Sequence, residues 1–413
     1  MAHSSSAPVP AASPRGRPRG LRPLPAAPVR RVTDRERRAR LATRHALAPA
    51  HRVGSPSAVA RAMTVLHATE PATVPLSCHA RMHSLTIREV DRALFTDRGL
   101  VKQLAMRRTL FAFPRDLLPA AWAGASARVA AVERARVTRD VVAAGLASDG
   151  DDWLDRARGE VLALLADHPD GLTAREIRGA VPRIDVRVAV RPGDPWTASR
   201  VLTQLGATAD LVRGTNTADW YVSRPRWTRT RDWLGDTPAP MTAADGYREI
   251  TRRWLYSFGP GTEDDLVWWL GATRTIVREA LAALGAVPVA LDTGAIGWLL
   301  ADDVDELADP GPWAALLPVL DPTVMGWRAR DFYLGPHREP LFERRGNAGT
   351  TAWVNGRVVG CWVQDEAGRV RVRPLERLSA DEERLLGAET ERLTAWLAGF
   401  RVPTGYVSPA MRP

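Results

Sequence analysis

The first informative pattern of apolar positions lies in residues 57–66, where three apolar residues recur at helical spacing. These are Val59, Met63 and Leu66. The spacing predicts a helix, and Pro71 disfavours the α conformation in the residue before it, so we expect the helix to end at about Thr69 or Glu70. His67 would then lie in the last helical turn and Thr69 at the rim, both able to face a cleft.

Further along the chain, helical spacing followed by two short apolar runs around a turn recurs three times. In the first copy we expect a helix over 86–94 and strands over 100–106 and 110–113. In the second we expect helices over 171–180 and 196–205 and strands over 209–212 and 220–222. In the third we expect helices over 261–270 and 273–284 and strands over 287–291 and 296–300. Two helices followed by a turn-linked strand pair predict a winged helix-turn-helix, here in three tandem units.

Beyond residue 310 the pattern becomes richer in strands. Asn355-Gly356 lies between two alternating apolar runs, which is a strong hairpin signal. A further strand is expected up to Leu375, and Ser379 with Glu382 predicts a capping box for a helix through Leu397. The sequence therefore predicts an α+β protein in which three winged helix-turn-helix units precede a β-rich, barrel-like C-terminal domain. The expected boundaries are 1–31 for a disordered tail, 32–125, 126–240 and 241–310 for the units, and 311–413 for the last domain.

The formal net charge of +10 lies almost entirely at the N-terminus. Residues 1–52 contain twelve Arg against Asp34 and Glu36, which accounts for the whole excess, so the rest of the chain is balanced. Residues 1–31 are rich in Pro, Ala, Ser, Gly and Arg and are expected to be disordered. They fit an unstructured tail that attracts polyanions, an organelle transit peptide, or sequence upstream of the true start.

Composition excludes several classes of protein. Two Cys are too few for a disulfide framework, and no apolar run approaches membrane-spanning length, so we expect a cytoplasmic protein. Walker motifs, phosphate-binding Gly-rich loops and nucleophile elbows are absent, so neither a cofactor nor a nucleotide is expected. Cys78, His79 and His83 are too few for a structural zinc site, so no metal is expected. No heptad pattern indicates dimerisation, and a monomer is expected.

Three stretches resemble a known family. They are VLHATEPATVPLSCHARM, LLPVLDPTVMGWRARDFYLG from Leu316 and RRGNAGTTAWVNGRVVGCWVQ from Arg344. They resemble the winged-helix DNA-binding family that contains the AlkZ and YcaQ DNA glycosylases, over roughly residues 32 to 410. The resemblance implies double-stranded DNA as partner and excision of alkylated bases or unhooking of crosslinks as activity. The family's Gln-x-Gln or Gln-x-Asp triplet, which places the attacking water, matches His67-Ala68-Thr69 here.

This triplet suggests a chemistry for the site. An alkylated purine already leaves as a cation, so the protein has to extrude the base, place a water and stabilise an oxocarbenium-like sugar. His67 could accept a hydrogen bond from that water as a neutral imidazole, Thr69 could orient it, and Glu70 could supply a carboxylate. If His67 acts this way, activity should fall as the pH drops through roughly 6 to 7. The alternatives are a structural histidine at a helix end and a noncatalytic, regulatory or architectural DNA-binding protein.

Six arginines are candidate DNA ligands because winged helices place Arg side chains on phosphates. They are Arg107 and Arg108 at the first hairpin turn, Arg200 on the second copy's later helix, Arg274 and Arg278 on the third, and Arg330 in the aromatic and basic stretch after Asp321. That stretch could equally be a loop anchored in the core. Lys102 is the only lysine, so an excising enzyme is expected to be monofunctional and not to nick DNA through a Schiff base.

Overall fold

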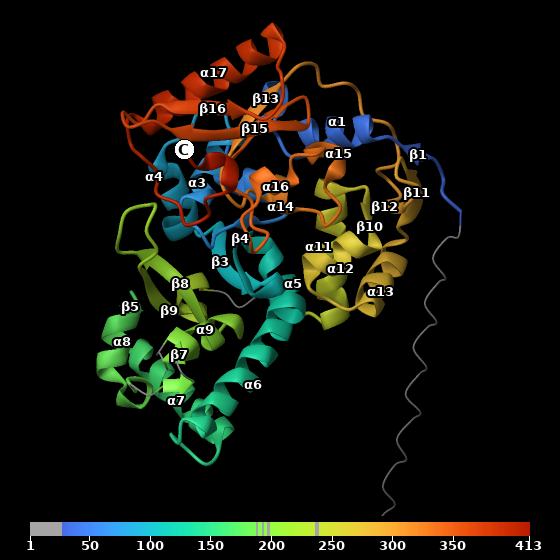
Figure 1. The fold of residues 1–413 in the computed structure, drawn as a ribbon. Helices are drawn as coiled ribbons and strands as arrows, with labels where there is room; N and C mark the ends of the chain where they lie inside the picture. Colours follow the sequence, from blue (N-terminus) through green and yellow to red (C-terminus); the bar gives the residue numbers. More distant parts are fainter. Residues whose placement is uncertain (1–26, 187–188, 192–193, 196–198, 236–238) are drawn as a thin grey trace, which may run out of the picture.

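A computed structural model describes residues 27–186, 189–191, 194–195, 199–235 and 239–413. The chain is a mixed α+β protein whose sheets are small and separate, as Figure 1 shows. Three segments share one order of elements: a two-residue strand, two helices and a hairpin. We refer to residues 66–114, 172–229 and 261–299 as the first, second and third units.

The first unit begins with the short strand that carries His67. Its elements are β2 (Leu66–His67), α3 (Thr73–Arg81), α4 (Ile87–Asp91) with a π-helical extension (Arg92–Thr96), β3 (Leu100–Ala105) and β4 (Thr109–Pro114). The strand order is β2-β4-β3, so the short strand pairs with the returning strand of the hairpin.

The other two units repeat this pairing. The second contains β5 (Leu172–Thr173), α8 (Ala174–Ala180), α9 (Ser199–Ala207), β8 (Leu211–Asn216) and β9 (Pro225–Arg229), in strand order β5-β9-β8. The third contains β10 (Gly261–Thr262), α12 (Glu263–Leu270), α13 (Arg274–Leu284), β11 (Val287–Leu291) and β12 (Ile296–Leu299). Left-handed Gly271 and Gly285 end its two helices, where a side chain would be strained.

Helices outside the units cover and connect them. They are α1 (Asp34–Arg44), α2 (Pro56–Ala62), α5 (Leu118–Ala121), α6 (Ala127–Ala143), α7 (Gly150–Ala166), α10 (Thr230–Leu234) and α11 (Ala243–Phe258). A small hairpin, β6 (Ala189–Arg191) and β7 (Asp194–Pro195), precedes α9. One hydrophobic core joins the first unit, the third unit and the C-terminal part, whereas α6, α7 and the second unit have a core of their own. The latter form the green lobe at the lower left of Figure 1.

The C-terminal part is an open sheet, not the barrel that the sequence predicted. Its strands are β13 (Ala314–Leu317), β14 (Thr351–Val354), β15 (Arg357–Gln364) and β16 (Val370–Pro374), all antiparallel and in sequence order. Four strands in sequence order leave β13 and β16 as edges, and α17 (Ala380–Leu397) packs on the sheet. The short helices α14 (Pro322–Met325), α15 (Asp331–Leu334) and α16 (Arg338–Leu341) connect β13 to β14.

The helix predicted to run to Thr69 or Glu70 ends earlier, at Ala62. Thr64 has a left-handed φ of 63°, which a helix cannot contain, and the chain then enters β2. Pairing with β4 overrides the local helical spacing, because the buried backbone groups of β2 need partners. His67 therefore lies on a strand.

Two further expectations differ from the structure. The strand predicted at 220–222 is a loop, because the Asn216 side chain binds the carbonyl groups of Ala218 and Val222 and holds residues 217–224 out of the sheet. The predicted disordered tail falls mostly on residues 1–26, outside the described residues. Its last residues, Arg30 and Arg31, are placed: β1 (Arg31–Val32) pairs in parallel with β11. Within the described residues no helix has the length and apolarity needed to cross a membrane.

Candidate active site

His67 is held inside the first unit by strand pairing. It lies opposite Phe111 of β4, with the two ring centroids 5.4 Å apart, and only 7% of its surface is exposed. Burial, assisted by the charge of Arg107, lowers the pKa of His67 to about 3. The imidazole is therefore neutral at any physiological pH. Since no helix ends at this residue, no helix C-terminal dipole favours the imidazolium.

The Nδ1 atom of His67 is buried and has no hydrogen-bond partner among the residues that the structure describes. An unpaired buried polar nitrogen costs about 1–3 kcal/mol, so such atoms are rare outside functional sites or water sites. His67 thus has a hydrogen-bonding position that the described residues leave unused.

Thr69 and Glu70 follow in the segment between β2 and α3. Thr69 is exposed, while Glu70 is half-buried, and burial raises the pKa of the Glu70 carboxyl above its ordinary value. Its Oε2 atom accepts a hydrogen bond from the backbone N–H of Gly405, at 3.3 Å, in the C-terminal segment. The structure therefore places the three predicted catalytic residues in one short segment but in three different environments.

A buried ion pair supports α3, the helix that follows this segment. Arg81 donates to Asp321 at 2.7 Å, and both side chains are fully buried. Ser77 also donates to Asp321 at 2.7 Å. Although burial alone would raise it, the Arg81 guanidinium and these hydrogen bonds hold the pKa of Asp321 below its ordinary range. The sequence reading missed this pair, because its members are 240 residues apart.

Arg107 comes close to His67 from the hairpin turn between β3 and β4. Arg107 and Arg108 both have left-handed φ angles, 54° and 60°, which cost non-glycine residues roughly 1–2 kcal/mol each. The Arg107 guanidinium stacks 3.9 Å from the ring centroid of Trp268 on α12. Although part of the Arg107 side chain is exposed, desolvation of its guanidinium against Trp268, together with the charge of Arg330, lowers the pKa of Arg107 to about 10.

The Arg330 guanidinium also lies over this indole, 5.0 Å from its centroid. It is 3% exposed, and its Nε atom donates to the backbone carbonyl of Trp327 at 2.7 Å. Its Nη2 atom is buried without a partner among the described residues. Of the six predicted DNA ligands, the structure brings Arg107 and Arg330 together at Trp268, and the charge of Arg107 also acts on His67.

The other four predicted ligands are paired with carboxylates. Arg108 binds the buried Glu133, and Arg200 binds Asp140 and is only 12% exposed. Arg274 and Arg278, on α13, share Glu263 of α12, and both are about half exposed. Arg200 thus belongs to the packing of its lobe, while Arg274 and Arg278 stay at the surface.

Comparison with known proteins identifies the relationship. A family model described as "DNA glycosylase AlkZ-like" matches residues 60–396. The chain belongs to this family. The solved structure of the Streptomyces sahachiroi DNA glycosylase AlkZ is 21% identical to it, with a TM-score of 0.70, and the match covers 90% of this chain and 99% of that chain. At this identity the likeness is one of fold. No curated protein sequence matches the chain.

The matched region of this AlkZ-like chain includes the His67 segment, Arg107, Trp268 and Arg330. Trp268 was not predicted as a site residue. Its signal in the sequence is weak, since Trp268 and Trp269 are adjacent on a helix, and only the fold shows that Trp269 is buried whereas Trp268 is partly exposed and faces the turn.

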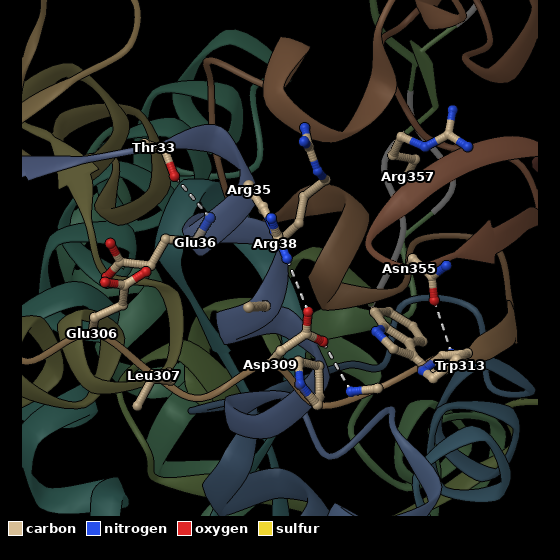
Figure 2. Close-up of a pocket in the computed structure, with 14 residues that line it drawn as sticks. Thr33, Arg35, Glu36, Arg38, Glu306, Leu307, Asp309, Trp313, Asn355 and Arg357 are labelled. Atoms are coloured by element: carbon tan, nitrogen blue, oxygen red, sulfur yellow. Dashed lines mark hydrogen bonds and ion pairs between the residues drawn. The ribbon is translucent and has the colours of Figure 1, made fainter.

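Two hollows of the surface bear on the site. One lies beside α1, and only the other is lined by a residue of the segment 67–70. Figure 2 shows a hollow of about 730 Å³ between α1, residues 306–313 and the β14–β15 turn, where Arg35 and Asp309 already form an ion pair. It contains none of the predicted catalytic residues. A smaller cavity of about 190 Å³ is lined by Glu70 and by residues of the C-terminal segment.

Cys78, His79 and His83 do not form a metal site in the structure. Among the described residues no cluster of three or more His, Cys, Asp or Glu side chains has a geometry that could hold a metal. Cys78 is a buried core residue, and His79 packs against Trp396 with its centroid 4.8 Å away.

Proposed function

We propose that this AlkZ-like protein is a monofunctional DNA glycosylase that hydrolyses the N-glycosidic bond of alkylated bases, including crosslinked ones, in duplex DNA. Family membership supports a glycosylase-like function. The observation that carries the proposal to this site is the neutral His67, whose Nδ1 has no partner among the described residues, two positions before the exposed Thr69 and three before the half-buried Glu70.

The proposed reaction follows from these environments. The C1′–N bond of the alkylated nucleoside breaks, and the bonding electron pair leaves with the base, which neutralises the charge of the alkylpurine. Water adds to C1′ of the oxocarbenium-like sugar and loses a proton, which the Glu70 carboxylate can accept. His67 orients that water as a neutral hydrogen-bond partner, and a neutral ring does not repel the cationic sugar. The product is an abasic site.

We further propose that the three units are winged helices that hold duplex DNA, within the predicted boundaries 32–125, 126–240 and 241–310, and that the protein acts as a cytoplasmic monomer. The common strand–helix–helix–hairpin order supports this interpretation. Because winged helices also serve as protein-interaction modules, the DNA role rests on the family relationship.

The direct test is to incubate the full chain with duplex DNA that carries a single N7-alkylguanine and to measure abasic sites by alkaline strand cleavage. We expect time-dependent abasic product, and no covalent adduct on borohydride treatment because Lys102 is the only side-chain amine. A borohydride-trapped adduct would contradict the monofunctional assignment.

A noncatalytic DNA-binding protein is the second candidate. The observation that favours it is the burial of His67, whose Nδ1 atom no solvent reaches in this structure. Tight binding of alkylated duplex without any abasic product would support this candidate and overturn the first.

A further inference from the structure

Three exposed arginines, of which Arg107 lies close to His67, lack carboxylate partners among the described residues, unlike most arginines at the surface. Arg107, Arg328 and Arg338 are exposed, and within the part of the chain that the structure describes none of their side chains forms an ion pair or a hydrogen bond. Paired guanidiniums such as Arg274 and Arg278 are already partly neutralised. The unpaired ones keep their full capacity for an external anion.

The buried Arg330 links Arg107 with Arg338, and a shared hollow links Arg338 with Arg328. Arg107 and Arg330 share the Trp268 ring, and the charge of Arg338 acts on Arg330. Arg328 and Arg338 line a hollow of about 810 Å³ that extends to Arg274 and Arg278 on α13. Positively charged side chains thus extend from Arg107, close to His67, to Arg274 and Arg278 on α13.

Contacts with α12 and its C-cap fix the positions of Arg107 and Arg328. The buried Asp265 caps α12 by accepting from Thr262, and its other oxygen accepts from the backbone N–H groups of Arg328 and Ala329 at 2.8 and 2.9 Å. Arg107 is fixed by its stack on Trp268 and by the close approach of Gly271, where an added Cβ would lie 3.0 Å from the Arg107 side chain. Side chains held in advance lose little entropy on binding.

The turn itself is built against local preference. Two consecutive left-handed residues in a hairpin turn favour Asn-Gly or Gly-Gly, yet Arg107 and Arg108 occupy them. Strain retained at such positions points to a role for the side chains. Arg108 forms an ion pair with Glu133, whereas Arg107 has no carboxylate partner among the described residues and only stacks on Trp268.

We propose that Arg107, Arg328 and Arg338, supported by the buried Arg330, form a phosphate track that binds consecutive phosphodiesters of one DNA strand and brings the target nucleotide to His67. This inference rests on the proposed function and names the face of the molecule that binds DNA. Planar guanidiniums bind phosphate oxygens in pairs of parallel hydrogen bonds, and the orphan Nη2 of Arg330 marks donor capacity that the protein alone leaves unused. The track uses a hairpin turn, the loop after Trp327 and the start of α16, whereas helix-turn-helix recognition predicts contacts from the second helices α9 and α13.

The test compares two triple variants of the full chain in duplex binding at several salt concentrations. One is Arg107→Gln, Arg328→Gln and Arg338→Gln. The other is a control of equal charge loss on exposed arginines elsewhere, Arg156→Gln, Arg371→Gln and Arg384→Gln, whose side chains are 64%, 56% and 71% exposed. Each lost phosphate contact lowers the slope of log affinity against log salt by about 0.9, so the track variant should lose about 2 to 3 in slope and the control less than about 1.

The outcomes separate this inference from the proposed function. A track variant that keeps the wild-type slope overturns the track, even when wild-type protein excises alkylated bases. Wild-type protein that binds no duplex overturns the proposed function and the track together. The double variant Arg328→Gln, Arg338→Gln leaves the hairpin turn intact and should still lose about 1 to 2 in slope, so a folding defect at Arg107 cannot account for the result.

Discussion

The first and third units reach their first helix in different ways. In the third unit β10 leads directly into α12, and Thr262 and Asp265 form a capping box. In the first unit Ala68 to Ala72 intervene between β2 and α3, and Ala72 offers no side-chain cap. The added segment contains the exposed Thr69 and the half-buried Glu70. The first unit thus gives up a local stabilising motif at the position where the proposed chemistry lies.

Distant contacts replace the missing cap in the first unit. Arg81 and Asp321 join α3 to the C-terminal part, and the Thr73 hydroxyl donates to the carbonyl of Val319 at 3.0 Å. Local hydrogen bonds therefore hold the third junction, and tertiary contacts hold the first. The predictions below test that difference, from the largest expected effect to the smallest.

Breaking the buried ion pair should have the largest effect. Asp321→Ala leaves the Arg81 charge buried without a partner, so we expect the free energy of unfolding to fall by about 3–5 kcal/mol, measured by urea titration. Replacing both residues, as in Arg81→Met with Asp321→Leu, should cost less than Asp321→Ala alone. If the single variant is as stable as wild type, α3 is not held by this pair.

Removing the imidazole should have the next largest effect, on excision and not on folding. His67→Ala is expected to lower single-turnover excision of N7-alkylguanine by about 10²-fold and to leave duplex affinity within a few-fold. His67→Gln, which restores the amide of the resembled triplet, should retain more activity than His67→Ala. Equal activity of His67→Ala and wild type would move the catalytic role to Glu70.

Elements held by local contacts could be predicted from the sequence, whereas elements held by distant contacts could not. The third unit and α17 were predicted closely, because their caps and turns are local: Thr262 with Asp265, Gly285, and Ser379 with Glu382. β2 was not predicted, because two residues become a strand only through pairing with β4. In all three units a two-residue strand precedes the first helix. Aligning the three units with one another was therefore the one way to expect a strand at β2.

The candidate site shows the same limit. The sequence predicted four residues that the structure places at the candidate site: His67, Glu70, Arg107 and Arg330. Burial determines their pKa values and their free hydrogen-bonding positions, and the sequence did not reveal which of them are buried. The expected loss of activity through pH 6 to 7 rested on an ordinary histidine pKa, whereas the pKa of His67 is about 3. Arg200 resembled Arg274 by its place on the second helix of a unit, yet Asp140 holds it within its own lobe.

As the pH decreases, the free energy of unfolding should therefore fall before protonation of His67 can lower the rate of excision. The pKa values of His67 and His45 are lowered by burial to about 3, so the unfolded chain takes up protons below about pH 6.5 while the folded chain does not. Stability is full above that pH and falls as the pH decreases, by about 1.4 kcal/mol per unit for each such histidine.

At pH 5.5 we thus expect His67 alone to account for a loss of about 1.4 kcal/mol, which His67→Gln should remove in urea titrations at pH 7.5 and 5.5. Excision by wild type should stay level between roughly pH 8 and 6 and decline only as Glu70 takes up a proton. A midpoint of activity near 6.5 that disappears in His67→Gln would show that the imidazole titrates normally.

The smallest expected effect lies at the third junction. Thr262 accepts a hydrogen bond from the backbone N–H of Asp265 at 3.1 Å, so Thr262→Ala removes one cap and should lower stability by about 1 kcal/mol, whereas Thr262→Ser should be close to wild type. Asp265 still binds the backbone N–H groups of Thr262, Arg328 and Ala329, which limits the loss. A loss above about 3 kcal/mol in urea titration would mean that the third junction depends on tertiary contacts as much as the first, and the contrast between the two units would not hold.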